Sequence, residues 1–240
     1  MKKHQFSALV ITGLAFVLLC IAACAVEYPL TITDSAGRGV TFTMPVERVI
    51  VTSTDAAEAV VVLGAADKVV GVSDTVQKKG YYFPQLKDKQ STGKWNALDY
   101  EMIGEIARDG GEDITPDIVV IGYSYPDKPY GIYGVEKSLA PFENIKAVAL
   151  EFTKPENITR EIEILGQILG KEKEASDYIK WYVEKSASVV QATGGQSMPK
   201  VYAEWSSTSD LSALGPGSGF DSVLSLDRVR KDLRWNSTPH

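Results

Sequence analysis

Histidine is almost absent from this 240-residue sequence. The two histidines, His4 and His240, stand near the two ends of the chain. A serine nucleophile in the body of the chain would therefore have no histidine base, and no Gly-x-Ser-x-Gly elbow occurs. The same lack disfavours direct capture of bare zinc or manganese, for which imidazole is the usual ligand. The residues predict neither a catalytic centre nor a cofactor.

Cysteine is equally rare, with Cys20 and Cys24 the only two. Both lie in or beside the apolar run 8–23, which follows a short basic stretch and ends in small side chains. This layout is typical of an export signal, and the run is brief for a membrane span, which needs about 20 apolar residues. An uncleaved anchor helix is the alternative. Residues 25–240 contain no cysteine, so no disulfide is expected there.

Positive charge is in deficit, since 25 basic residues face 31 acidic ones and the net charge is −6. Binding to nucleic acid normally uses a basic face, so a nucleic-acid partner is not expected. The hydrophobic content of 44% is ordinary for a globular protein and allows a real core.

Short β-branched runs alternate with helical patterns in the first two thirds of the chain. After a predicted hairpin at 28–44, strands are expected at 48–52, 68–72, 118–121 and 145–150. Helices are expected between them, the first capped near Ser53, Thr54 and Asp55 with Glu58 completing a capping box, another capped by Asp99. This order predicts an α/β fold with a doubly wound parallel sheet and helices on both faces.

A long helix is predicted at residues 171–193. It follows a shorter helix that opens with a capping box at 153–156 and ends at Gly170. The apolar positions of the long helix recur every three or four residues, and at 1.5 Å per residue it is roughly 34 Å long, enough to link two globules.

A strand is expected at 200–205, but only the 42 positions 199–240 remain for a second lobe, so we expect that lobe to be incomplete. The predicted parts are an export signal at 1–24, an N-terminal lobe at 25–152, linker helices at 153–195 and a partial C-terminal lobe at 196–240.

Four motifs in this order resemble the solute-binding lipoproteins of ATP-binding-cassette (ABC) importers for iron complexes and cobalamin. They are Pro-Val-Glu-Arg-Val-Ile-Val at 45–51, Lys-Val-Val-Gly-Val-Ser at 68–73, Asp-Tyr-Glu-Met-Ile at 99–103 followed by Thr-Pro-Asp-Ile-Val-Val at 115–120, and Leu-Gly-Pro-Gly-Ser-Gly-Phe at 214–220. In that class one long helix joins two lobes of similar size. The shorter second part here is what a truncated or frame-shifted gene product would give.

The resemblance implies roles for two residues. Cys24 closes an Ile-Ala-Ala-Cys lipobox and would carry the lipid that anchors the protein outside the cytoplasm, at the outer face of the cytoplasmic membrane. Glu101 matches the first-lobe glutamate that docks on arginines of the membrane permease. Alternatively, Glu101 only favours the positive end of its helix dipole. The matching second-lobe glutamate is expected beyond Leu226, where the sequence offers no counterpart.

The ligand site of a doubly wound sheet lies at the carboxyl ends of its strands. That rule selects polar and aromatic residues of the first lobe, which Trp205 and the glycine loop 215–219 would face from the second lobe. Rings in loops suit a large planar or chelated ligand, although some of them could simply pack on the lobe edge. The first-lobe candidates are Ser53, Thr54, Tyr81, Tyr82, Trp95, Tyr123, Tyr125, Tyr130 and Tyr133.

Three other patterns in the sequence do not indicate a function. The glycine loop lacks the following Lys-Ser/Thr of a P-loop, the sequon at Asn157 lies in a predicted helix, and Glu161 and Glu163 are expected at the surface. The function that the resemblance implies is capture of an iron-siderophore, haem-like or cobalamin-like complex for an ABC permease and its ATPase. A surface-anchored α/β hydrolase and a degenerate lipoprotein without transport are the alternatives.

Overall fold

The structure, a computed structural model, describes residues 26–111, 113–194, 202–206, 211–214 and 219–226. The predicted export signal with Cys24, most of the glycine loop, and the side chain of Trp205 lie outside this part. Within the described residues, no helix has both the length and the apolar character that crossing a membrane requires.

A five-stranded sheet forms the centre of the first lobe. Its strand order is β5-β4-β3-β8-β9, and all neighbours are parallel. The strands are β3 (Arg48–Val51), β4 (Val69–Val72), β5 (Gln90–Ser91), β8 (Ile118–Gly122) and β9 (Lys146–Ala149). The four predicted strands are confirmed within two residues at each end. The edge strand β5 was missed, because two polar residues give no β pattern.

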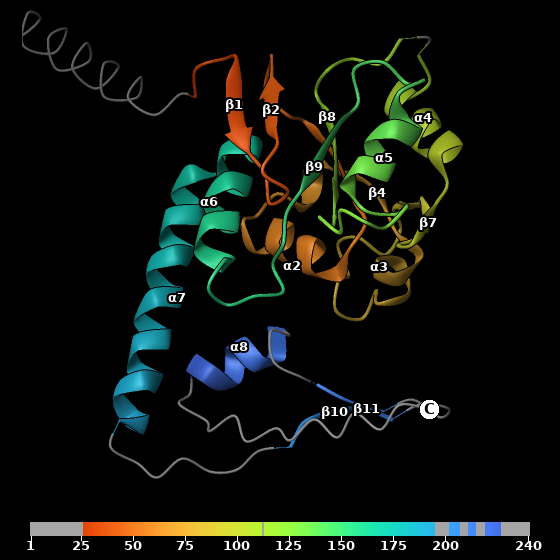
Figure 1. The fold of residues 1–240 in the computed structure, drawn as a ribbon. Coiled ribbons are helices and arrows are strands. Elements are labelled where there is room, and N and C mark those ends of the chain that lie inside the picture. Colours follow the sequence, from red (N-terminus) through yellow and green to blue (C-terminus); the bar gives the residue numbers. More distant parts are fainter. Residues whose placement is uncertain (1–25, 112, 195–201, 207–210, 215–218, 227–240) are drawn as a thin grey trace, which may run out of the picture.

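Helices cover both faces of this sheet (Figure 1). They are α2 (Thr54–Val62), α3 (Asp74–Lys78), α4 (Tyr100–Arg108), α5 (Ile132–Leu139) and α6 (Ile158–Leu169), with a 3-10 turn at Ala66–Lys68 and a small hairpin of β6 (Gly93–Lys94) and β7 (Ala97–Leu98). Along β3, Val49 and Val51 belong to the core cluster shared with α2 and α6, whereas Ile50 belongs to the one shared with α4 and α5. Alternate side chains of one strand thus fill two cores, as a doubly wound sheet requires.

Helix α2 is capped by Ser53, whose Oγ accepts a hydrogen bond from the Ala56 amide at 3.1 Å. Ser53 is one of the three predicted caps and is confirmed. The predicted capping box of Asp55 and Glu58 is wrong, because Asp55 lies inside the first turn of the helix. Asp99 caps α4 as predicted, accepting from the Met102 amide at 3.0 Å.

The capping box predicted at 153–156 is wrong as well. Helix α6 begins at Ile158 after Asn157, and Thr153 instead donates to Glu151. The helix ends at Gly170 with φ +65°, as expected.

The predicted hairpin is present as β1 (Leu30–Thr33) and β2 (Gly39–Phe42). Its turn covers the exposed edge of β9. Asp34, only 1% exposed, accepts from the Ala149 amide at 3.1 Å, and Arg38 donates to the Ala147 carbonyl at 2.8 Å. Edge groups that could pair with another chain are thereby satisfied inside the lobe.

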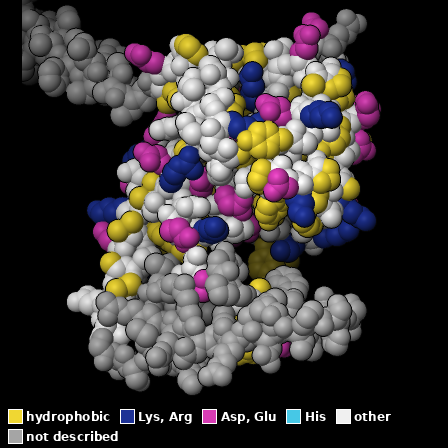
Figure 2. Space-filling model, in the orientation of Figure 1, with side chains coloured by type: hydrophobic (Ala, Val, Ile, Leu, Met, Phe, Trp, Pro, Cys, Tyr) yellow, Lys and Arg dark blue, Asp and Glu magenta, His cyan; other side chains and the backbone are white. Residues whose placement is uncertain are grey.

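Helix α7 (Glu172–Thr193) is continuous over 22 residues, which confirms the predicted long helix. It packs against α6 where Gly166 faces Ala175; a Cβ on Gly166 would lie 2.6 Å from that of Ala175. The apolar stripe is covered only at its start. Val183 and Val189 are 52% and 43% exposed, and hydrophobic side chains reach the surface along this helix (Figure 2).

Beyond α7 the structure describes β10 (Glu204–Ser206), β11 (Leu211–Ala213) and α8 (Gly219–Leu226), with β10 and β11 antiparallel. Figure 1 shows these elements below the first lobe, at the far end of α7. Ser222 on α8 lies against the connection from β9 to α6, its Oγ 3.2 Å from Glu156 Oε1. The predicted α/β fold with a parallel sheet and a long helix is confirmed.

Candidate ligand-binding site

The carboxyl ends of the parallel strands gather the polar and aromatic candidates. Ser53 follows β3 and is buried, Tyr123 follows β8 directly, and Glu151 lies two residues after β9. The connection from β9 to α6 touches α8 through Glu156 and Ser222. This edge of the sheet therefore faces the elements beyond α7.

Four half-buried rings form what we call the aromatic cluster: Trp95, Tyr123, Tyr125 and Tyr130. Their contacts close a cycle. Ring centroids lie 5.6 Å apart for Trp95 and Tyr123, 4.8 Å for Tyr123 and Tyr125, 6.0 Å for Tyr125 and Tyr130, and 5.2 Å for Tyr130 and Trp95. Tyr123 and Tyr125 are stacked, and the other three pairs meet edge to face, the geometries that aromatic quadrupoles favour. The structure thus brings together four residues that the sequence selected separately.

Two glycines fix the loop that carries three of these rings. A Cβ on Gly131 would lie 1.9 Å from the Tyr125 carbonyl oxygen, and one on Gly134 would lie 2.0 Å from that of Pro129. The Ile132 amide also donates to the Ser124 carbonyl at 3.2 Å. The loop therefore rests directly on the first turn of α5, and the rings are held in place before any ligand arrives.

Tyr123 is the most perturbed group of the cluster. Burial, with the nearby Asp55, Tyr125 and Glu151, raises the pKa of Tyr123 to about 12, although a hydrogen bond with Ser53 acts in the opposite direction. Burial also raises the pKa of Tyr125. Both phenols stay neutral at physiological pH and present apolar faces with a polar rim.

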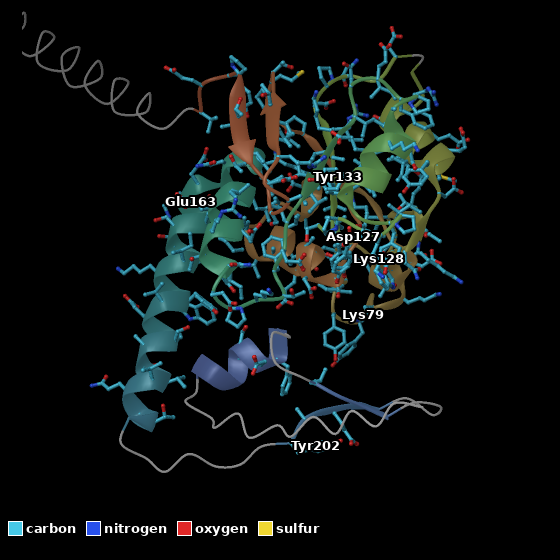
Figure 3. All side chains as sticks on the ribbon, viewed as in Figure 1. Lys79, Asp127, Lys128, Tyr133, Glu163 and Tyr202 are labelled. Carbon is cyan, nitrogen blue, oxygen red and sulfur yellow. The ribbon has the colours of Figure 1, made fainter. Side chains whose placement is uncertain are left out.

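The other first-lobe candidates are not in the cluster. Tyr81 and Tyr82 are 90% and 71% exposed and contact each other edge to face at 5.2 Å. Their loop is anchored by the buried Phe83, and Lys79 beside it lies at the lower edge of the lobe in Figure 3. Thr54 is the half-buried first residue of α2.

Tyr133 was expected in the aromatic loop, and this was wrong. It belongs to α5, and the Arg38 guanidinium lies over its ring. The guanidinium carbon is 5.7 Å from the centroid of the Tyr133 ring. Figure 3 shows it above Asp127 and Lys128, on the opposite side of them from Lys79. The helix begins at Ile132, one residue before Tyr133, and turns this ring towards the β1–β2 hairpin.

Sequence reasoning missed Glu151, which lines a pocket of about 450 Å³ beside Tyr125. Its Oε2 accepts from Ser124 Oγ at 2.8 Å, so its carboxylate lies next to the residue between Tyr123 and Tyr125. The strand-end rule could have found it, because it follows β9 as Ser53 follows β3.

The expectation that Glu161 lies at the surface was also wrong. It is 1% exposed, accepts from Ser35 Oγ at 2.7 Å, and pairs with Arg160 at 2.6 Å. The turn of the β1–β2 hairpin covers this side of α6. Glu163 is exposed as predicted (Figure 3).

Glu101 is exposed in the first turn of α4, two residues after the cap Asp99. This position suits both docking and a favourable contact with the helix dipole. Over the described part of the chain, no group of three or more His, Cys, Asp or Glu side chains is placed to hold a metal ion.

Comparison with known proteins gives one family. The sequence model of the periplasmic binding protein family matches residues 49–231. No curated protein matches. At the level of structure, petrobactin-binding protein YclQ of Bacillus subtilis is 17% identical with a TM-score of 0.66, the match covering 85% of this chain and 66% of that one.

Two proteins of Vibrio cholerae are similar in the same way. For vitamin B12 binding protein BtuF the identity is 16%, the TM-score 0.63 and the coverage 81% and 69%. For haem binding protein HutB the identity is 17% and the TM-score 0.60, and the match covers 76% of this chain and 64% of that one. At such identities the likeness concerns the fold, and this chain spans about half to two thirds of the length of the matched structures.

Proposed function

Because the chain belongs to the periplasmic binding protein family, we propose that it is the extracytoplasmic substrate-binding component of an ABC importer. It captures an iron-siderophore, haem-like or cobalamin-like complex and delivers it to a membrane permease. The observation that carries the proposal is the aromatic cluster at the carboxyl edge of the parallel sheet.

The cluster suits such a ligand because rings provide a wide contact surface at little cost in side-chain entropy. Gly131 and Gly134 hold the loop in one conformation, so little further ordering is needed on binding. The names of similarly folded proteins add support, since they include petrobactin-, haem- and vitamin B12-binding proteins.

In this proposal the ligand lies between residues 25–152, as the first lobe, and the part that follows the linker helices 153–195. Helix α7 connects the two parts without a break, which limits how far they can rotate apart. Trp205 and the glycine loop would approach the ligand from residues 196–240. Ser53 and Thr54, at the start of α2, and the exposed pair Tyr81 and Tyr82 would complete its border.

Tryptophan fluorescence tests this proposal. The full chain is titrated with a ferric hydroxamate, a ferric catecholate, haem and cobalamin, and the same titrations are made with Trp95→Phe and Trp181→Phe. Trp181 is the matched control, because it is 51% exposed on α7 and lies outside the cluster. We expect at least one complex to quench the emission saturably, with Trp95→Phe removing most of that response and Trp181→Phe retaining it. No saturable response to any complex would overturn the proposal.

We propose that Glu101 docks the loaded protein on the permease. Its exposure in the first turn of α4 leaves the carboxylate accessible to an arginine. Glu101→Arg is expected to reduce uptake in cells while leaving ligand affinity unchanged, whereas Glu105→Arg, on an exposed position of the same helix, should have little effect. Equal uptake by the Glu101 variant and the unmodified protein would contradict docking through this residue.

We also propose that Cys24 carries a lipid anchor. Metabolic labelling with an alkyne fatty acid should mark the unmodified chain and Cys20→Ala, but not Cys24→Ala. Labelling of Cys24→Ala, or none of the unmodified chain, would rule the anchor out.

A further inference from the structure

Two carboxylates flank the aromatic cluster from different elements. Glu151 enters from the end of β9, with its Oε2 2.8 Å from Ser124 Oγ, between two ring-bearing residues. Asp55 enters from the first turn of α2, two residues after Ser53. Both act on the same phenol, since Asp55 and Glu151 each contribute to the raised pKa of Tyr123.

Among the described residues, no cation forms a salt bridge with Asp55 or Glu151. Arg160 is engaged by Glu161 at 2.6 Å and by the Thr33 carbonyl at 2.8 Å. Lys79 acts on Asp55 from an exposed position, and Lys154 lines the pocket beside Glu151. Burial raises the pKa of Asp55, Lys79 lowers it, and the negative charge of Glu151 raises it by less than Lys79 lowers it.

The faces of the aromatic rings add further negative electrostatic potential. The quadrupole of an aromatic ring is negative over its face, and Trp and Tyr faces attract cations. Trp95, Tyr123, Tyr125 and Tyr130 are half-buried, so charges near them are less screened than at the open surface. Rings and carboxylates together make this edge of the sheet a place where a positive group is stabilised and an anion is opposed.

On the premise of the proposed function, we infer that the ligand presents a positively charged group to the aromatic cluster. This group is a quaternary or protonated amine, or a metal complex of net positive charge. A strongly anionic ferric complex would not be the preferred ligand of this site.

A pair of probes with the same shape and opposite charge tests this. Tetraphenylphosphonium and tetraphenylborate each carry four phenyl groups around one central atom, and their binding to the full chain is measured by equilibrium dialysis at 150 mM salt, where long-range surface attraction is largely screened. We expect the cation to bind at least tenfold more tightly than the anion. A ferric tris-catecholate, which is trianionic, should bind more weakly than a cationic tris-bipyridine complex of cobalt(III).

The carboxylate variants locate the effect. Glu151→Gln and Asp55→Asn should each weaken binding of the phosphonium probe three- to tenfold and leave the borate probe unchanged or bound more tightly. Glu163→Gln, an exposed position on α6, is the matched control and should change neither. Two variants on separate elements keep the test valid if one of them fails to fold.

The outcomes separate this inference from the proposed function. If the anionic probe or the ferric catecholate binds as tightly as its cationic counterpart, the charge preference is refuted while capture of a chelate stands. A cation preference that neither carboxylate variant alters refutes it as well, because it then reflects only the net charge of −6. If no probe and no complex from the fluorescence panel binds, both fail.

Discussion

Gly131 controls the shape of the aromatic cluster although it has no side chain. The Tyr125 carbonyl oxygen occupies the space where a Cβ would be, at 1.9 Å, and the carbonyl of Pro129 does the same at Gly134. A residue with any side chain at either position must push the loop away from α5. The rings of Tyr125 and Tyr130 move with the loop, so the effect on binding should exceed the effect on the core.

Gly131→Ala should lower the free energy of unfolding by about 1–3 kcal/mol, the usual cost of overpacking, and weaken ligand binding. Urea denaturation and the fluorescence titration measure the two effects. Gly39→Ala is the matched control, because a Cβ there meets nothing within 4 Å. Unchanged binding by a folded Gly131→Ala would show that the loop is not held as described.

Tyr123 makes stability depend on alkaline pH. Its pKa of about 12 in the folded protein exceeds the ordinary value of 10.0, so the folded state keeps a proton that the unfolded chain releases. The stabilisation is complete below pH 10 and is lost as the pH rises from 10 towards 12. Urea midpoints at pH 9 and pH 11.5 should differ less for Tyr123→Phe than for the unmodified protein.

Tyr123→Phe should still lose some stability at alkaline pH, because the pKa values of other tyrosines, such as Tyr125 and Tyr178, are also raised. An equal loss in both proteins would mean that Tyr123 titrates normally.

Among the helices and strands, the sequence predicted those with a clear apolar pattern. Residues 49–51 of β3 and 118–121 of β8 are continuous β-branched runs buried on both faces, and α6 and α7 repeat their apolar positions as helices do. Helix α3 and strand β5 were missed, because five and two residues are too few to show a period. Glu161 was misjudged because the turn that buries it is more than 120 residues away in sequence.

The candidate site was also predicted only in part. The strand-end rule selected all four members of the cluster, since each lies in a loop at that edge of the sheet. It also selected Tyr133, which helix α5 turns away, and it was not applied to Glu151. Which rings touch depends on contacts between loops such as those of Trp95 and Tyr130, and local sequence does not encode these.

Helix α6 is held to the hairpin by Glu161. Glu161→Ala removes the acceptor of Ser35 and the partner of Arg160, and we expect a loss of about 1–3 kcal/mol in the free energy of unfolding. Glu163→Ala, exposed on the same helix, should change stability by less than about 0.5 kcal/mol. Thermal and urea unfolding of the two variants measure this, and equal stability would contradict the role given to the buried carboxylate.

The crossing of α6 and α7 depends on two small residues. Ala175 is 2% exposed and faces Gly166, so Ala175→Leu should force the helices apart at a cost of about 1–3 kcal/mol. Val189→Leu, at a 43% exposed position of the same helix, is the control and should be nearly neutral. Circular dichroism followed through urea unfolding compares them, and a neutral Ala175→Leu would mean that the two helices do not pack this closely.

Helix α7 joins the first lobe to the elements that follow it. It starts against the first lobe through Ala175 and continues past it, with Val183 and Val189 exposed, to the elements β10, β11 and α8. The carboxyl edge of the sheet, with the aromatic cluster, faces the same direction. A ligand bound there would touch both parts of the molecule, and α7 would limit their relative motion.

Hydrogen exchange measured by mass spectrometry, with and without a complex that quenches Trp95, shows whether the ligand binds at the aromatic cluster. We expect binding to slow exchange most in peptides covering 92–98 and 122–132, which contain the aromatic cluster, and little in peptides covering 183–190 of α7. Slowed exchange confined to segments outside the carboxyl edge of the sheet would contradict it.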